Sequence, residues 1–177
     1  MRVESNHRNP HPASWLVDNI SLLPRQGRAL DVAMGSGRNA VFLAQHGLDV
    51  EGIDISEKAV TSARHLAESA GVSIRALVAD LEDRFELIPD KYDVIICFNY
   101  LFRPLMPQIR EATRHGGFVV YETYIIDQAK WGEPKNQEHL LEHNELLNMF
   151  RDFRVLRYRE GIIEERKALA GLVAQRP

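Results

Sequence analysis

Short apolar runs alternate with longer amphipathic stretches along most of the chain, and this alternation limits the folds open to it. The runs predicted to be strands are residues 29–33, 48–53, 72–79, 92–98 and 118–121. The stretches 39–46 and 57–70 carry apolar residues at helical spacing, and each is followed by a glycine suited to a helix end. Strands joined by crossover helices pair in parallel, so the pattern predicts a parallel sheet with helices on both faces.

Residues 94–98 form an uninterrupted apolar run, which is typical of a central parallel strand buried on both faces. After it, Pro104 suits the first position of a helix, and Gly116–Gly117 is expected to end that helix. A short helix over residues 14–23 and a late helix over residues 145–150 complete the predicted helices.

The end of the chain is predicted to form two further strands, residues 153–158 and 168–174. The polar connection between them, residues 161–166, is too short for a crossover helix, so the pair should be an antiparallel hairpin. The expected fold class is therefore α/β, with a single doubly wound, mostly parallel, seven-stranded Rossmann-like sheet that ends in a C-terminal antiparallel hairpin. Residues 1–13 are expected to be a flexible arm and residues 14–177 one domain.

Composition agrees with one globular domain and excludes several classes of protein. The 177 residues are 45% hydrophobic and 27% charged, which disfavours disorder and a coiled coil. The net charge of -3 lacks the basic footprint of a nucleic-acid binder, although five arginines between residues 151 and 166 leave an RNA acceptor open. Cys97 is the sole cysteine, so no intramolecular disulfide is expected. No apolar run reaches membrane-spanning length and the first residues hold no secretory signal, so a cytoplasmic location is expected.

Acidic, glycine and polar residues follow the predicted strands, where ligands bind in parallel α/β sheets. Asp31, Gly35 and Gly37 lie at the end of the first strand and in its loop, Asp54 follows the second strand and Asp80 the third. Each has an ordinary structural explanation, such as a turn, a helix cap or a loop carboxylate. Together they place three acids and a glycine turn at one edge of the sheet, which predicts a ligand site there.

Two cofactors fit this edge. Gly35-x-Gly37-x-x-Ala40 satisfies the dinucleotide fingerprint, and Asp54 follows Gly35 by 19 residues, as an NAD-binding acid would. An NAD(P)-dependent reductase is therefore one interpretation. Against it, Asp31 precedes the glycines by four residues, and the final hairpin departs from the second half of a full NAD-binding fold.

The sequence resembles the class I S-adenosylmethionine-dependent methyltransferases, and among them the small bacterial tellurite-resistance-type enzymes. Asp31-x-Ala33-x-Gly35-x-Gly37 is similar to the glycine-rich motif of that family, with Ala33 in place of its first glycine. The resemblance covers roughly residues 30–124. It implies S-adenosyl-L-methionine as cofactor and S-adenosyl-L-homocysteine as product. The cofactor-binding residues that it implies are Asp31, Ala33, Gly35, Gly37, Arg38, Asn39, Asp54, Ile55, Asp80, Leu81, Phe98 and Asn99. Asp54 would hold the ribose, Asp80–Leu81 the adenine, and Phe98–Asn99 the methionine part.

The chemistry implied is in-line attack of an acceptor lone pair on the methyl group, helped mainly by proximity and orientation. The candidates for acceptor contacts follow the fourth and fifth strands: Tyr100, Arg103, Glu122 and Tyr124. Arg103 could hold an anionic acceptor, Glu122 could take a proton, and either tyrosine could face the sulfonium or orient the acceptor. For each of them, packing or solvent exposure is the competing interpretation. Whether a general base is used stays open.

The function expected is methyl transfer to a small-molecule acceptor by a monomer or homodimer, with no metal and no membrane partner. A methyltransferase-like binding module without catalysis is the non-enzymatic alternative. Residues 125–139, which include Trp131, could form a lid over the site together with the arm through Pro12, or they could be an ordinary surface loop.

Overall fold

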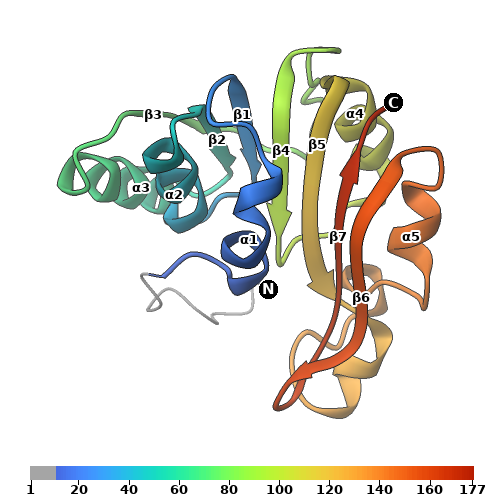
Figure 1. The fold of residues 1–177 in the computed structure, drawn as a ribbon. Coiled ribbons are helices and arrows are strands. Elements are labelled where there is room, and N and C mark those ends of the chain that lie inside the picture. Colours follow the sequence, from blue (N-terminus) through green and yellow to red (C-terminus); the bar gives the residue numbers. More distant parts are fainter. Residues whose placement is uncertain (1–10) are drawn as a thin grey trace.

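The fold is a seven-stranded sheet between two layers of helices (Figure 1). The computed structural model describes residues 11–177. The strands are β1 (Arg28–Val32), β2 (Asp49–Asp54), β3 (Ile74–Val78), β4 (Tyr92–Phe98), β5 (Thr113–Tyr124), β6 (Arg154–Glu164) and β7 (Lys167–Gln175). The α-helices are α1 (Ser14–Asn19), α2 (Arg38–His46), α3 (Glu57–Ser69), α4 (Met106–Ala112) and α5 (Glu145–Met149). The short 3₁₀ helices are η1 (Ile20–Leu22), η2 (Arg103–Leu105), η3 (Ile126–Lys130) and η4 (Gln137–His139).

The strand order is β3-β2-β1-β4-β5-β7-β6. Strands β1 to β5 pair in parallel, whereas β7 is antiparallel to both β5 and β6. The prediction of a doubly wound, mostly parallel sheet that ends in an antiparallel hairpin is therefore confirmed. The chain reverses its direction of travel across the sheet between β1 and β4, which is the switch point where ligands of such sheets bind.

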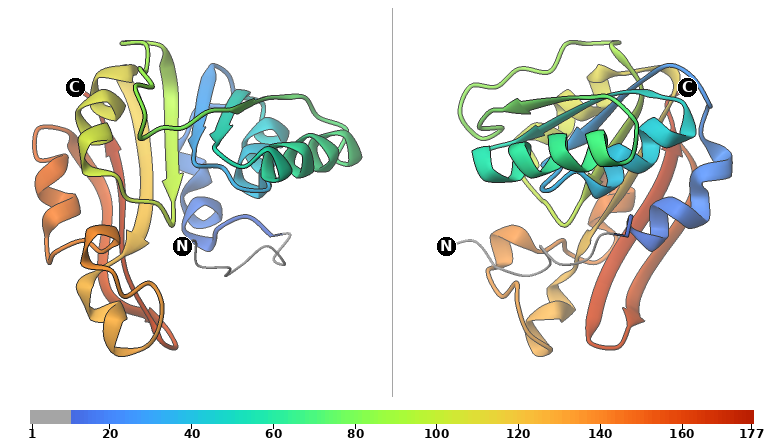
Figure 2. Two further views of the ribbon diagram at one scale, coloured as in Figure 1. Left: turned by 180° about the vertical axis from the view of Figure 1, so that it is seen from behind. Right: turned by 90° about the vertical axis from the view of Figure 1, so that its left-hand side faces the viewer.

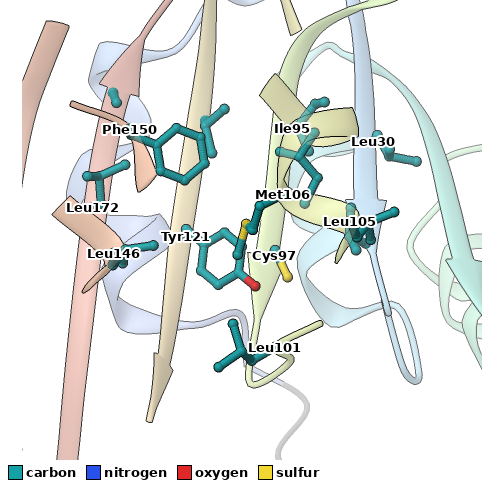
Figure 3. Close-up of a cluster of buried hydrophobic side chains, with 14 of the residues drawn as sticks. Leu30, Ile95, Cys97, Leu101, Leu105, Met106, Tyr121, Leu146, Phe150 and Leu172 are labelled. Carbon is teal, nitrogen blue, oxygen red and sulfur yellow. The ribbon is translucent and has the colours of Figure 1, made fainter. Parts of the chain in front are cut away.

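Helices lie on both faces of the sheet (Figure 2), and an apolar cluster packs against each face. On one face, Ile109 of α4 and Phe150 beside α5 pack against strand residues such as Tyr121, as Figure 3 shows for the larger members of this core. On the other face, α1 and α2 contribute Leu16 and Leu43 to a second cluster. Every helix in the described part of the chain is too short or too polar to cross a membrane.

The helix predicted to end at Gly116–Gly117 stops earlier. It ends at Ala112, and both glycines lie inside β5, which begins at Thr113. Gly116 has a φ of 78°, and a Cβ on Gly117 would lie 2.9 Å from the carbonyl oxygen of Arg114. The glycines therefore permit an irregular stretch within a strand, beside a register shift between β4 and β5, and do not mark a helix end.

The predicted connection 161–166 is also wrong, because β6 runs to Glu164 and β7 starts at Lys167. Gly161, Ile162 and Glu164 pair with Leu169, Ala168 and Lys167, and the two isoleucines at positions 162 and 163 favour a strand over a loop. As a result the hairpin extends past the rest of the sheet, beside the segment that contains η3 and η4 (Figure 1).

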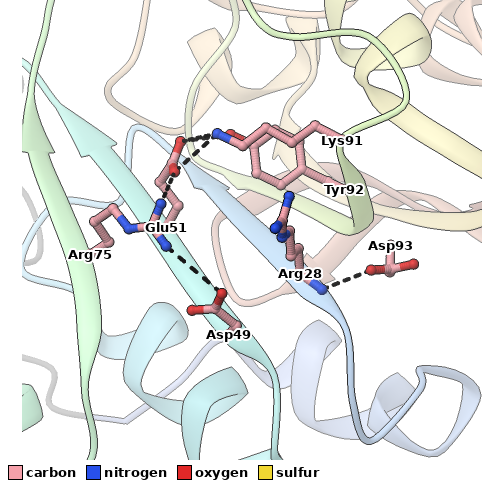
Figure 4. A network of polar contacts seen from close by, with 7 residues as sticks. All are labelled: Arg28, Asp49, Glu51, Arg75, Lys91, Tyr92 and Asp93. Carbon is pink, nitrogen blue, oxygen red and sulfur yellow. Dashed lines mark hydrogen bonds and ion pairs between the residues drawn. The ribbon is translucent and has the colours of Figure 1, made fainter.

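A buried glutamate organises the amino-terminal part of β2, at some distance from the switch point (Figure 4). Glu51 accepts hydrogen bonds from Tyr92 Oη at 2.6 Å and from Lys91 Nζ at 3.1 Å. Burial alone would raise the pKa of Glu51, but these two donors together lower it below its usual value. The negative charge of Glu51 is balanced by the cations of the same network, and we therefore interpret the network as structural.

Candidate functional site

The loop after β1 exposes its backbone at the switch point. Ala33, Gly35 and Gly37 all have positive φ, at 54°, 57° and 81°. Met34 donates its N–H to the carbonyl of Ile53 at 2.9 Å, which fixes the loop against β2. Among residues 11–177, a Cβ on Gly35 would meet no atom within 4 Å, so this part of the chain leaves open space beside the loop at Gly35. Open space beside a glycine lets a ligand approach the backbone closely.

Asp54 ties this loop to the end of β2. Its Oδ2 accepts the N–H of Gly35 at 3.0 Å, and its Oδ1 accepts the N–H of Ser56 at 2.8 Å. Ser56 in turn caps α3, because its Oγ accepts the N–H of Ala59 at 3.3 Å. The carboxylate is only 9% exposed, while Ile55 beside it is 48% exposed. A fixed anion therefore stands next to an exposed apolar side chain at the edge of the glycine loop.

Asp31 is a second buried acid, at the end of β1. It is 1% exposed, and its Oδ2 has no hydrogen-bond partner among residues 11–177. Burial raises the pKa of Asp31 to about 8, although the Ala40 amide and the Arg38 charge act in the opposite direction. A buried carboxyl group with an unsatisfied oxygen suits a ligand that brings a positive charge.

This raised pKa has a measurable effect on stability. The unfolded chain releases the Asp31 proton near its ordinary pKa, and the folded chain releases it only near pH 8. Between these values the folded state binds more protons, so this group's contribution makes the free energy of unfolding fall as pH rises from about 4 to about 8. Asp31→Asn is expected to remove that part of the slope. Urea unfolding across this pH range measures it, and parallel curves for both proteins would contradict the assignment.

The other predicted cofactor residues lie at the ends of β3 and β4. Ala79 donates its N–H to the carbonyl of Asp54 at 3.1 Å, which brings the third loop against the second. Asp80 is exposed and accepts the N–H of Glu82, and Leu81 is buried in the core. Asn99, after the buried Phe98, has a φ of 55°. The structure thus brings the four strand ends to the same edge.

Arg38 and Asn39 contact the N-terminal segment. Arg38 Nη1 donates to the carbonyl of His11 at 3.1 Å, and Asn39 Oδ1 accepts the N–H of Ala13 at 2.8 Å. These two bonds fix the start of α1 beside the glycine loop. Residues 1–10 of the expected flexible arm lie outside the described residues.

Of the acceptor candidates, Tyr100 and Arg103 are both engaged within the protein. Tyr100 Oη donates to Glu82 Oε1 at 3.2 Å, and burial raises the pKa of Tyr100 above its usual value. Arg103 forms a two-point ion pair with Glu145, at 2.6 and 2.9 Å. Its Nη atoms also donate to the carbonyls of Glu138 and Leu140. Since every nitrogen of its guanidinium donates to one of these partners, Arg103 holds the segment before α5 in place.

Glu122 lies on the opposite face of the sheet from Tyr121 and is also ion-paired. Its Oε2 accepts Arg159 Nε at 3.1 Å and Nη2 at 2.5 Å. The Arg159 guanidinium lies 4.4 Å from the centre of the Trp15 ring. Arg159 is one of the five arginines between residues 151 and 166, and the sequence analysis assigned it no place in the site. The signal for its actual position was Glu122, a buried acid that needs a cation. Tyr124, the remaining candidate, is half-buried two residues after Glu122 on β5.

The segment considered as a lid is fastened at its base. Ile126 and Leu141 donate to carbonyls across the segment, both at 2.9 Å. Buried Gln128 accepts the N–H of Ala168 at 2.9 Å and so joins the segment to β7. Trp131 is 48% exposed. The anchors make the base of this segment a fixed wall, and a lid motion stays a prediction for the part around Trp131.

Among residues 11–177, no three histidine, cysteine, aspartate or glutamate residues come together as a metal site. His143, four residues after His139, binds Asp127 Oδ2 through Nε2 at 2.6 Å.

Solved structures with the same fold are methyltransferase-like. The chain matches TehB from Haemophilus influenzae with a TM-score of 0.79 and 20% identity, over 97% of this chain and 64% of TehB. It matches an S-adenosylmethionine-dependent methyltransferase from Mesorhizobium loti with a TM-score of 0.74 and 20% identity, over 95% and 100% of the two chains. These likenesses establish the fold.

Proteins with similar sequences are also methyltransferases by name. A ubiquinone biosynthesis O-methyltransferase from Azoarcus sp. (strain BH72) is 31% identical over 121 residues, which are 65% of this chain and 51% of that protein. The corresponding enzyme from Photobacterium profundum is 34% identical over 93 residues, or 52% and 39% of the two proteins. The chain thus spans about half the length of these curated relatives or less. The profile of the family described as "Methyltransferase domain" matches residues 29–117, half of the chain, and these residues run from β1 through the glycine loop and both buried acids into β5. With fold, strand-end residues and family profile in agreement, the chain belongs to the methyltransferase domain family.

Proposed function

We propose that this protein is an S-adenosylmethionine-dependent methyltransferase that acts on a small-molecule acceptor. The observation that carries the proposal is the carboxylate of Asp54, which is bound to the glycine loop at Gly35 and to the start of α3 at Ser56. This arrangement holds an acid and an open backbone loop at the switch point of a methyltransferase-family sheet. The relatives named as O-methyltransferases support a small organic acceptor.

The residues at this edge fit the proposed cofactor. Asp54 would accept the ribose hydroxyls, as the family resemblance implies, and exposed Ile55 beside it offers an apolar surface to the cofactor. The unsatisfied oxygen of Asp31 suits the positively charged end of S-adenosylmethionine. Gly35 leaves the backbone open, so a bulky ligand can lie against the loop.

Bound S-adenosylmethionine would supply a methyl group on a sulfonium, which an acceptor lone pair displaces. The protein's own residues then have to orient the two molecules and exclude water. Trp15, Glu122 and Tyr124 border the acceptor side, and the carboxylate of Glu122 already accepts two donors from Arg159. Because proton uptake by Glu122 would compete with that ion pair, we assign it a positioning role in place of general base.

The reductase interpretation predicts a different ligand for the same loop. Gly35, Gly37 and Asp54 satisfy its fingerprint as well, so a direct comparison of ligands is needed. Titration calorimetry with S-adenosylhomocysteine, NAD and NADP shows which of these three ligands the protein binds. We expect micromolar affinity for S-adenosylhomocysteine, a free energy of about -8 kcal/mol, and no heat with either nicotinamide nucleotide. Binding of NAD or NADP alone would overturn the proposal, and silence with all three ligands would favour a binding module without cofactor.

A further inference from the structure

We propose that Arg159 binds the methyl acceptor and that the acceptor carries an anionic oxygen group, a carboxylate or a phosphate. This inference deepens the proposed function and rests on it. It begins from a difference between two arginines near the switch point. Arg103 donates from Nε, Nη1 and Nη2 to partners within the protein. Arg159 uses only Nε and Nη2, and its Nη1 has no hydrogen bond within the described residues 11–177.

The position of Arg159 is fixed by pairing across the hairpin. Arg159 on β6, Gly171 on β7 and Glu122 on β5 form one row of the sheet. A Cβ on Gly171 would lie 3.0 Å from the Trp15 ring and 3.1 Å from Glu122 Oε2. Because glycine stands there, the long side chain of Arg159 can cross β7 and reach Glu122.

This row ends at the place where methyl transfer is proposed. Glu122 pairs with Phe98 at the end of β4, and the Glu122 carbonyl accepts the N–H of Asn99 at 2.9 Å. Trp15 covers the guanidinium from the side of α1, whose first residues are bound to Asn39 beside the glycine loop. Arg159 therefore lies on the same face as α1, at the level of the carboxyl end of β4.

Space is available beside the guanidinium. The next row toward the tip of the hairpin consists of Gly161, Leu169 and Tyr124. Within the part of the chain that the structure describes, a Cβ on Gly161 would meet no atom within 4 Å, so this row leaves open space on β6 next to Arg159. The side chain of Arg159 is 24% exposed, whereas that of Glu122 is 9% exposed.

The hydrogen-bond donors of Arg159 favour a ligand with an anionic group. Two hydrogen bonds to Glu122 and the stack on Trp15 hold the guanidinium plane, so little side-chain entropy is lost when a ligand binds. The unused N–H groups of a planar guanidinium match the oxygens of carboxylates and phosphates. The ion pair with Glu122 is neutral overall, so a bound anion would complement the positive charge that the cofactor brings.

The test uses small aromatic probes on protein saturated with S-adenosylhomocysteine. Benzoate and phenyl phosphate carry the two anionic groups, and benzamide is the neutral counterpart of benzoate. Titration calorimetry should show that benzoate or phenyl phosphate binds at least about tenfold more tightly than benzamide. The anion that binds more tightly identifies which of the two groups the acceptor carries.

Arg159→Gln is expected to abolish this preference while the affinity for S-adenosylhomocysteine is unchanged. Arg159→Lys, which keeps the charge but lacks the planar fork, should keep only part of it. Arg157→Gln is the matched control, since Arg157 is an exposed arginine one row earlier on the same face of β6. If Arg159→Gln fails to fold because Glu122 loses its ion pair with Arg159, the double variant Glu122→Gln/Arg159→Gln, which removes both charges, replaces it.

The outcomes separate the two proposals. If the unaltered protein does not bind S-adenosylhomocysteine, the proposed function itself is contradicted. Normal binding of S-adenosylhomocysteine overturns the role of Arg159 in three cases: if no anionic probe binds, if benzamide binds as tightly as benzoate, or if Arg159→Gln and Arg157→Gln behave alike.

Discussion

Asp54→Ala is expected to weaken the binding of S-adenosylhomocysteine about a hundredfold, or by about 2.7 kcal/mol. The carboxylate makes two kinds of contribution. It would bind the ribose hydroxyls directly, and it also holds the glycine loop through the N–H of Gly35 and the start of α3 through the N–H of Ser56. Alanine removes all of these acceptors from a position that is only 9% exposed. Calorimetric titration of both proteins measures the effect.

Two further variants separate charge from structure. Asp49→Ala changes an exposed acid at the other end of β2, whose ion pair with Arg75 is 3.8 Å long, and it should leave the affinity unchanged. Asp54→Asn keeps the size of the side chain and one oxygen acceptor, so its affinity should fall between those of the alanine variant and the unaltered protein. If folded Asp54→Ala binds S-adenosylhomocysteine as tightly as the unaltered protein, the cofactor site has been placed incorrectly.

The largest loss of stability is expected for Gly37→Ala. A Cβ on Gly37 would lie 2.6 Å from the Cβ of Ala63, a fully buried residue of α3. The φ of 81° adds backbone strain for any residue with a side chain. Overpacking and strain together should lower the free energy of unfolding by about 2–5 kcal/mol. Urea unfolding followed by circular dichroism measures this change.

Gly35→Ala is the matched control in the same loop. Its φ of 57° is also positive, but a Cβ there would meet no atom within 4 Å. Only the backbone strain applies, so the loss of stability should be smaller, about 1 kcal/mol. The new methyl group would instead enter the space proposed for the cofactor, so Gly35→Ala should weaken the binding of S-adenosylhomocysteine. Equal losses of stability in the two variants would show that the contact between Gly37 and α3 is not close.

The meeting of the proposed cofactor residues at one edge of the sheet could be predicted from the sequence because these residues follow the order of the strands. Asp31, Gly35, Asp54, Asp80 and Asn99 each stand at or just after a strand of the parallel sheet. The carboxyl ends of parallel strands meet at one edge, so the positions of these residues along the chain determine their meeting place in space. Local signals placed helix ends in the same way: Ser56 caps α3, and Gly47 ends α2 with a φ of 112°.

The acceptor side depended on contacts that no local pattern contains. Arg103 and Arg159 are chemically identical, and the sequence favoured Arg103 because it follows β4. Arg103 is committed to Glu145, 42 residues later, whereas Arg159 meets Glu122, 37 residues earlier, only because β7 inserts between β5 and β6. The sequence by itself determined the order of the strands and the acids and glycines at their ends. The tertiary structure alone decided that Nη1 of Arg159 makes no hydrogen bond among residues 11–177 while Nη1 of Arg103 does, because that depends on pairings between distant segments.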